Sequence, residues 1–363
     1  MQRQKILILQ IISSPIGGGA QVLARELGQR IKSDDFNSEV VYFNKISQPS
    51  VKLHDNESSL FTGDRNLLTI LKLRKLIKNR LKIYQKIIIH VHLTYPFFYV
   101  PIATLFLDVV LLFTEHNTSN KRRGIPFFKH IERIFYNRYK KICCISKGVE
   151  NALSEWLGKN LDNRLVTINN GAILYTFKER SGFVKPKIIS IGSLTKKKNF
   201  KTTIKAISLI KDEIESYFII GEGTERDFLN KLIKENGLEK KINLLGWSDQ
   251  VEKYLHEADI QLIPSLWEGF GLVAVEGMST GIFVIASEVD GLKEVLGQNN
   301  PSIKLVRDIE SPEKWAFEIQ QSIIFLQSNI KEVAISARKQ SEKYSIEKMI
   351  ESYNAVYHSF SKK

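Results

Sequence analysis

The chain has 363 residues, of which 43% are hydrophobic and 25% are charged. This composition excludes a disordered chain, a collagen and a disulfide scaffold, and the length suggests two domains. The formal net charge is +14, and the whole excess lies in the first half: residues 1–180 hold 28 basic and 14 acidic side chains, whereas residues 181–363 hold 25 of each. The two halves are therefore expected to meet different partners.

Short apolar runs rich in Ile and Val alternate with helical patterns along the chain. Continuous apolar runs predict parallel strands covered on both faces, and their alternation with helices predicts an α/β protein with doubly wound sheets. The expected strands in the first half span 5–12, 39–43, 87–93, 109–114, 141–145 and 165–168. Those in the second half span 187–191, 217–220, 242–244, 260–263, 283–286 and 303–306.

The series of strands restarts after a polar stretch at 176–187, which is interpreted as a linker. We therefore expect an N-terminal Rossmann-like domain over 1–178 and a second Rossmann-like domain over 184–344. An apolar stripe at helical spacing predicts a C-terminal helix within 345–363. Because ligands of open parallel sheets bind beyond the carboxyl ends of the strands, a cleft between the two domains is the expected site.

The first expected strand is followed by the turn Gly17-Gly18-Gly19 and then by an amphipathic helix. The start of the chain superficially resembles a signal peptide, but strand, turn and helix describe it better. Such a turn lets backbone N–H groups approach an anion at a helix N-terminus. The dinucleotide fingerprint needs a further glycine where this chain has Val22, so NAD binding is disfavoured. A purely structural turn is the alternative.

Three lysines, Lys196, Lys197 and Lys198, lie between the strand 187–191 and an expected helix at 200–210. Lysine does not complement the positive end of a helix dipole. A bound anion would reconcile the two, and a solvated lysine run is the alternative.

The most informative segment is PSLWEGFGLVAVEGMSTG at 264–281. Glu268 precedes glycines that leave the backbone N–H groups of Phe270, Gly271 and Leu272 free to hold a phosphate at the start of a helix. Glu276 follows in that helix. Two carboxylates beside an anion are unfavourable unless each accepts hydrogen bonds from neutral hydroxyls, such as those of a sugar and a ribose. Exposed helix glutamates are the alternative reading.

At this point the sequence resembles glycosyltransferase family 4, the large retaining family of group 1 glycosyl transferases with the GT-B fold. The family's two-glutamate signature matches Glu268 and Glu276, and its phosphate-lysine segment matches GSLTKKKNF, which puts the diphosphate lysine at Lys198. Further matching segments are GGGA at 17–20, TEHN at 114–117, CISKGV at 144–149, NNGA at 169–172, GEGTE at 221–225 and LLGWSDQVEKYLHEAD at 244–259.

The resemblance implies a role for each matched residue. Glu276 would bind ribose hydroxyls, Glu268 would contact the donor sugar, and His116 would line the reaction centre. Lys198 would hold the diphosphate, helped by Gly18 and Gly19 and by the amides at 270–272. The C-terminal helix would pack back on the N-terminal domain.

One position departs from the family pattern. Many members carry Arg where this chain has Ser193, so Lys196 or Lys197 is expected to compensate, or donor affinity to be lower. His90 and His92 alternate on one strand without a carboxylate or cysteine neighbour and are read as structural or cleft-lining. No Asp-x-Asp pair suits a metal–diphosphate clamp, so we expect no metal and no cofactor.

The resulting hypothesis is a retaining hexosyltransferase-type enzyme that uses a nucleotide sugar and a glycan or lipid-linked acceptor, in bacterial surface polysaccharide or lipopolysaccharide biosynthesis. A nucleotide-sugar epimerase or dehydrogenase and a non-catalytic, membrane-associated sugar-binding protein are the alternatives. The adjacent Cys143 and Cys144 are not expected to bridge, which indicates a reduced, cytoplasmic protein.

The segment 65–86 suggests a location at the inner face of the cell membrane. From Arg65 to Leu107 the chain has eight basic residues and no acidic one. Seven apolar residues recur among them at helical spacing: Leu67, Ile70, Leu71, Leu73, Leu76, Ile77 and Leu81. A basic amphipathic helix can lie on an anionic leaflet. The alternative is a solvated helix whose leucines face the core. No aromatic residues interleave with the charges, so nucleic acid is not expected.

Overall fold

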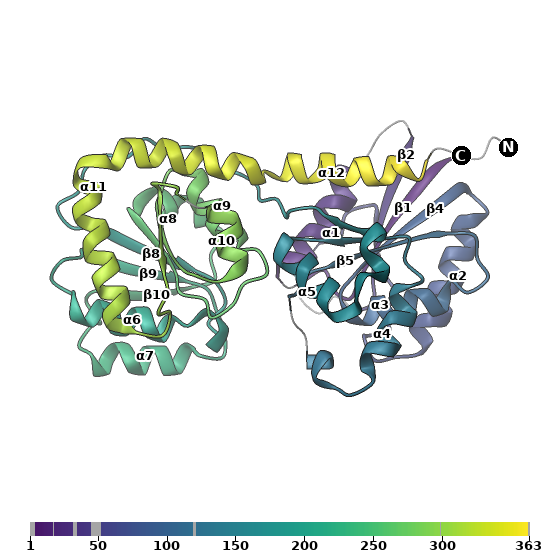
Figure 1. Cartoon of the computed structure of the whole chain (residues 1–363), viewed down its shortest axis with the longest axis horizontal. Coiled ribbons are helices and arrows are strands. Elements are labelled where there is room, and N and C mark those ends of the chain that lie inside the picture. The colour runs from purple at the N-terminus through teal and green to yellow at the C-terminus, as the bar shows by residue number, and fades with distance from the viewer. Residues whose placement is uncertain are drawn as a thin grey trace. The chain divides into compact units, whose positions relative to one another are not determined.

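The computed structural model describes residues 4–16, 18–31, 35–44, 52–118, 121–297 and 299–361. The chain forms two compact units: unit 1 comprises Met1–Asn170 with Glu347–Lys363, and unit 2 comprises Gly171–Ile346. Figure 1 shows helices and strands alternating in both.

Unit 1 is built on a parallel sheet of seven strands in the order β3-β2-β1-β4-β5-β6-β7. The strands are β1 (Gln4–Ile12), β2 (Phe36–Tyr42), β3 (Glu57–Ser59), β4 (Tyr84–His92), β5 (Val110–Glu115), β6 (Lys141–Cys144) and β7 (Leu165–Thr167). The α-helices are α1 (Gly19–Arg30), α2 (Leu68–Leu81), α3 (Thr94–Ala103), α4 (Phe128–Tyr136), α5 (Lys147–Leu157) and α12 (Ile346–Ser359). The short 3-10 helices η1 (Lys121–Gly124) and η2 (Lys159–Arg164) complete the described part of the unit.

The apolar run near the N-terminus forms β1, which pairs in parallel with β2 and with β4. Its residues Leu7, Ile8 and Leu9 are fully buried, as continuous apolar strands covered on both faces should be. The other five strands expected in this half are also present. Cys143 and Cys144 are buried free thiols.

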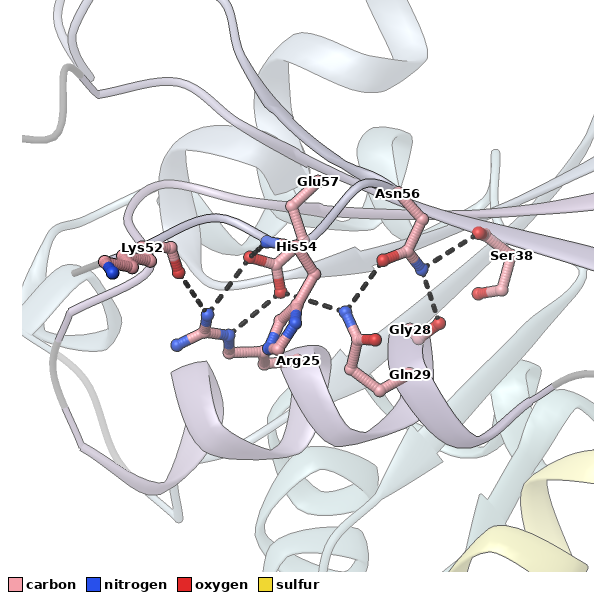
Figure 2. A network of polar contacts seen from close by, with 8 residues as sticks. All are labelled: Arg25, Gly28, Gln29, Ser38, Lys52, His54, Asn56 and Glu57. Atoms are coloured by element: carbon pink, nitrogen blue, oxygen red, sulfur yellow. Dashed lines mark hydrogen bonds and ion pairs between the residues drawn. The ribbon is translucent and has the colours of Figure 1, made fainter.

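The edge strand β3 was not expected, because its sequence Glu-Ser-Ser is short and polar. It is held by contacts to α1 that Figure 2 shows: Arg25 forms an ion pair with Glu57 at 2.9 Å, and Gln29 donates a hydrogen bond to Asn56. The amide of Asn56 in turn donates to the carbonyl of Gly28. Distant charges and amides thus create an element that local sequence does not indicate.

The last helix, α12, packs within unit 1. Its residues Met349, Tyr353 and Tyr357 are buried. The hydroxyl of Tyr357 accepts a hydrogen bond at 3.0 Å from Gln10 of β1. The apolar stripe of this helix therefore faces the first strands of the chain.

Unit 2 contains a parallel sheet of six strands in the order β10-β9-β8-β11-β12-β13. They are β8 (Lys187–Ile191), β9 (Ser216–Ile220), β10 (Ile242–Gly246), β11 (Ile260–Ile263), β12 (Phe283–Ser287) and β13 (Ile303–Val306). Its helices are η3 (Lys196–Lys198), α6 (Phe200–Leu209), α7 (Arg226–Glu235), α8 (Val251–Glu257), α9 (Leu272–Ser279), α10 (Asp290–Leu296), α11 (Pro312–Ser341) and η4 (Glu342–Tyr344). In Figure 1, α6 and α7 lie on one side of these strands and α8 and α9 on the other.

The stretch interpreted from the sequence as a linker, 176–187, packs against unit 2. Arg180 is buried and donates hydrogen bonds to the carbonyls of Leu255, Ala258 and Thr280. The division between the units falls after Asn170, earlier than the polar composition suggested, because one buried guanidinium anchors this polar segment.

Candidate active site

The predicted donor-site residues of unit 2 follow two neighbouring strands of its sheet. The strand order reverses between β8 and β11, which makes that position the topological switch point, where open α/β sheets bind ligands. Lys198 follows β8, and Glu268 and Glu276 follow β11. The backbone N–H of Leu266 donates to the carbonyl of Lys197 at 2.8 Å and joins the two loops.

Glu268 is the centre of a small charged cluster. Lys198 donates a hydrogen bond to Oε1 of Glu268, Ser265 donates to the same oxygen at 3.0 Å, and Nζ of Lys197 lies 3.4 Å from Oε2. Burial raises the pKa of the Glu268 carboxyl, but the charges of Lys198 and Lys197 outweigh burial and leave that pKa below its ordinary value. Glu268 is therefore ionised and held in one place.

Lys198 reaches this cluster because the chain makes room for its side chain at a glycine. Gly192 has φ = +154°, and a Cβ there would lie 3.1 Å from Cε of Lys198. Ser193 is exposed. Lys196 and Lys197 were expected to compensate for the arginine that many family members carry at position 193. Lys197 contacts Glu268, whereas Lys196 is exposed.

Glu276 lies about one turn into α9. Burial raises the pKa of its carboxyl, and the charge of Lys198 lowers it in part. Its charge also contributes to the raised pKa of Tyr175, which is about 12, mainly through burial of that phenol. One lysine thus acts electrostatically on both predicted glutamates.

The turn that begins α9 brings the predicted amides to the same edge of the sheet. Gly271 is left-handed at φ = +97° and precedes Leu272, and Phe270 is buried. The first N–H groups of a helix have no carbonyl partner within it, so that of Leu272, with those of Gly271 and Phe270 directly before the helix, suits an anion.

In unit 1, the predicted residues lie at the carboxyl edge of the first sheet. Gly18 caps α1 and Gly19 begins it, and both are exposed, whereas Gly17 lies outside the described residues. The strand order reverses between β1 and β4, so this turn also follows a strand of a switch point. Leu93, directly after β4, has φ = +67°, a strained value typical of functional sites.

His116 follows β5 and is 9% exposed. Its Nε2 lies 3.3 Å from Nδ1 of His92, and its backbone N–H donates to Glu115. Burial lowers the pKa of the His116 imidazole to about 3, so the ring is neutral at physiological pH. His90 and His92, read from the sequence as structural or cleft-lining, are fully buried in the same hydrogen-bonded network.

Sequence reasoning missed three members of this network: Gln10, Tyr353 and Tyr357. The only available signal was that polar residues interrupt an apolar strand and an apolar helical stripe. Among the described residues, no group of three or more His, Cys, Asp or Glu side chains is arranged to hold a metal ion.

The expected basic helix is present as α2, but its apolar residues divide between two faces. Leu73 and Ile77 are buried, while Leu67, Leu68 and Leu71 are exposed by 57–70%. The core-facing reading therefore holds for Leu73 and Ile77, and binding of this helix to a membrane surface stays a prediction. No helix in the described part of the chain is long and apolar enough to cross a membrane.

Comparison with solved structures identifies the fold. A glycosyltransferase of Rickettsia africae superposes with a TM-score of 0.83 at 21% identity and covers 99% of each chain. An Anabaena protein in complex with UDP-glucose has a TM-score of 0.80 at 18% identity, over 97% of this chain and 99% of that one. The fold is GT-B, with two Rossmann-like parallel-sheet domains.

Sequence comparison then gives the family. The model of Glycosyltransferase Family 4 matches residues 17–174, and that of Glycosyl transferases group 1 matches residues 176–354. The chain belongs to glycosyltransferase family 4.

The relatives include an uncharacterised glycosyltransferase of Methanocaldococcus jannaschii, 29% identical over 70% of each chain. A lipopolysaccharide core biosynthesis glycosyltransferase of Rhizobium meliloti is 26% identical over 50% of this chain and 53% of its own. A Campylobacter jejuni enzyme named for transfer of N-acetylgalactosamine to a diphospho-undecaprenol-linked sugar is 32% identical over 34% of each chain.

Proposed function

We propose that this glycosyltransferase moves a sugar from a nucleotide sugar to a hydroxyl of a glycan or lipid-linked acceptor, with retention at the anomeric carbon. The observation that carries the proposal is the cluster at the unit-2 switch point, where Lys198 acts on both Glu268 and Glu276. The Anabaena neighbour in complex with UDP-glucose supports the donor class. Relatives named for lipopolysaccharide core and O-antigen biosynthesis support a role in making bacterial surface polysaccharide.

The cluster suits departure of a diphosphate. Breaking the bond from the anomeric carbon to the phosphate oxygen leaves its electron pair on the diphosphate, and Lys198 with the amides at 270–272 stabilises that charge. Glu276 accepts hydrogen bonds from ribose hydroxyls, and Glu268 from the donor sugar. The acceptor oxygen forms the new bond on the same face, and its proton passes to the departing phosphate.

The proposal is tested with a panel of nucleotide sugars. A donor that binds only the native state raises the melting temperature. Release of nucleoside diphosphate with an acceptor, and a product with the donor's anomeric configuration, would complete the test. An inverted product would contradict retention. Binding without any turnover would favour the non-catalytic sugar-binding alternative, and bound NAD would favour the epimerase or dehydrogenase alternative.

We further propose that the reaction needs no metal ion, because Lys198 supplies positive charge at the switch point of unit 2 that can neutralise the diphosphate. Activity is expected to be the same with a chelator and with added magnesium. Loss with the chelator and recovery with magnesium would contradict this.

We also propose that unit 1 binds an anionic membrane surface through residues 65–86, extended by the segment up to 141. Residues 65–141 hold sixteen lysines and arginines and only three acids, and two of those acids, Glu115 and Glu132, are buried. The lysines Lys75, Lys78 and Lys82 are exposed. Large exposed apolar side chains accompany them at the start of α2 and on it, after α3, and at the start of α4 and on it: Leu67, Leu68, Leu71, Phe106, Phe127, Ile131 and Ile134.

Charge complementarity selects an anionic leaflet, which attracts each nearby basic residue by about 1 kcal/mol. Co-sedimentation should show binding to vesicles with phosphatidylglycerol that weakens with salt. Lys75→Glu with Lys78→Glu should abolish it, whereas Lys211→Glu with Lys240→Glu, an equal change at exposed sites of unit 2, should not. Equal recovery with neutral and anionic vesicles would overturn the proposal. A membrane-bound enzyme of this kind would work at the cytoplasmic face, beside a lipid-linked acceptor.

A further inference from the structure

A continuous chain of buried polar side chains connects three strands of unit 1 with α12. Its members are at most 9% exposed, although all of them carry hydrogen-bonding groups. They are Gln10 of β1, His90 and His92 of β4, Thr114 of β5, His116, and Tyr353 and Tyr357 of α12. Buried polar groups need hydrogen-bond partners. This requirement limits which atom of each hydrogen bond in the network can carry the proton.

The amide of Gln10 sets that order, because its oxygen only accepts hydrogen bonds and its nitrogen only donates them. Oε1 of Gln10 lies 2.9 Å from Nε2 of His92, so His92 carries its proton on Nε2. Burial holds the pKa of all three histidines far below the usual value, and a neutral imidazole has one N–H and one acceptor nitrogen. Nδ1 of His92 is therefore an acceptor, and the facing Nε2 of His116 is its donor.

The hydrogen bonds that run from Gln10 through Tyr357 to His90 are consistent with this assignment of protons. Nε2 of Gln10 donates to the hydroxyl of Tyr357, which lies 2.6 Å from Nδ1 of His90 and can donate its own proton to that nitrogen. The proton of His90 is then on Nε2, 2.6 Å from Oγ1 of Thr114. Every link thus has one donor and one acceptor. Turning over the Gln10 amide would reverse all of them together.

We propose that His92, held by Gln10, is a positioning residue that fixes His116 as its Nε2–H tautomer and leaves Nδ1 of His116 as a hydrogen-bond acceptor. His116 then receives a hydrogen bond from a hydroxyl group of a ligand and does not donate one to a phosphate oxygen. This last consequence rests on the proposed transferase function. The tautomer itself does not.

The tautomer is measurable on the full-length protein without any substrate. Nitrogen-15 NMR separates protonated from unprotonated ring nitrogens, and couplings to the two ring C–H groups distinguish Nε2 from Nδ1. The signals of His116 are those lost in His116→Asn. We expect a neutral ring with the proton on Nε2. A proton on Nδ1 would mean that every donor and acceptor in the network is reversed, and it would overturn the proposal. A charged ring would overturn it too.

Two substitutions of His92 test whether it sets this state. His92→Met removes both the donor and the acceptor, and His116 should then populate both tautomers. His92→Gln supplies one donor and one acceptor again and should restore the Nε2–H form. Tyr353→Phe, which removes a hydroxyl from the far end of the other branch, is the matched control and should leave the His116 signals unchanged.

Activity gives a second readout. His92→Met should lower kcat/KM by about tenfold or more, mainly through kcat, and His92→Gln should recover most of it. Unchanged His116 signals in a folded His92→Met protein would overturn the positioning role. If no transferase activity is found for the wild type, the proposed function fails while the NMR result still decides the tautomer.

Discussion

At the scale of single residues, the three consecutive lysines of η3 have different surroundings. Lys198 bonds to Glu268, Lys197 lies near it, and Lys196 is exposed. Charge near the diphosphate should therefore come mainly from Lys198.

Lys198→Ala is expected to lower kcat/KM by at least about tenfold, since a charge-assisted hydrogen bond contributes about 1.5–3 kcal/mol. Lys196→Ala, the same change two positions earlier, should have little effect, and steady-state kinetics of both variants makes the comparison. Similar losses in the two would contradict the assignment.

Glu276 gives a prediction with a pH signature. Its pKa is raised by burial, so its carboxylate takes up a proton at a higher pH than an ordinary glutamate does. A protonated carboxyl accepts fewer hydrogen bonds from ribose hydroxyls. Donor KM should therefore rise as the pH falls through this raised pKa.

In Glu276→Ala the same KM should be high at every pH, with kcat/KM reduced by about tenfold or more. Initial rates over a pH series, at fixed ionic strength, test this. A variant that keeps the pH dependence of the wild type would show that another group titrates.

At the scale of elements, the loop that carries Glu268 depends on a close approach by α10. A Cβ on Gly291 would lie 2.4 Å from the carbonyl oxygen of Glu268 and 2.8 Å from the carbonyl carbon of Gly269. Backbone atoms cannot move aside without displacing the segment that they belong to, so Gly291→Ala must shift the loop. A shift of about 1 Å at a reacting centre can cost about a hundredfold in rate.

We therefore expect Gly291→Ala to lose at least about tenfold in kcat/KM, with a cost of about 1–3 kcal/mol in the free energy of unfolding. Gly182→Ala is the matched control, because a Cβ there meets nothing within 4 Å. Activity and thermal unfolding would be measured on both. A fully active Gly291→Ala protein would mean that the position of this loop does not matter to the reaction.

The elements also show which parts of the fold a single sequence can predict. The β-strands other than β3 were predicted, because each contains a short apolar run bounded by turn or helix signals. The strand β3 is polar and short, and its stability comes from Arg25 and Glu57, which are distant in sequence. The apolar stripe of α2 was recognised, but the sequence did not say which leucines face the core.

The candidate site also contains residues that the sequence indicated and residues that it did not. Lys198 and Glu268 could be proposed from the sequence because each lies in a short local segment, after a predicted strand, that matches the family pattern. The wider hydrogen-bonded network around His116 was not predicted, since Gln10 and Tyr357 lie at opposite ends of the chain and meet only in the folded unit. Local sequence patterns thus predict the candidate ligand-binding groups. The residues that orient those groups come from topology.

At the scale of the whole molecule, the buried histidines make stability depend on pH. Burial lowers the pKa of His90 and His116 to about 3, and that of His92 well below its usual value. In the unfolded chain each histidine takes up a proton near pH 6.5. Above that pH both states are neutral and the histidines contribute no pH dependence. Below it the unfolded state binds more protons, so the free energy of unfolding falls until the folded-state pKa near 3 is reached.

The size of this fall can be predicted and checked. Each histidine should remove about 1.4 kcal/mol from the free energy of unfolding between about pH 8 and about pH 5.5. Urea titrations of the wild type over that range should show the loss, and His90→Gln should show about 1.4 kcal/mol less of it.

The comparison is between pH slopes, so a general destabilisation by the substitution does not affect it. His358→Gln, which changes an exposed histidine of α12 outside the buried network, is the matched control substitution. Equal slopes in wild type and His90→Gln would mean that His90 takes up its proton in the folded protein as readily as in the unfolded chain.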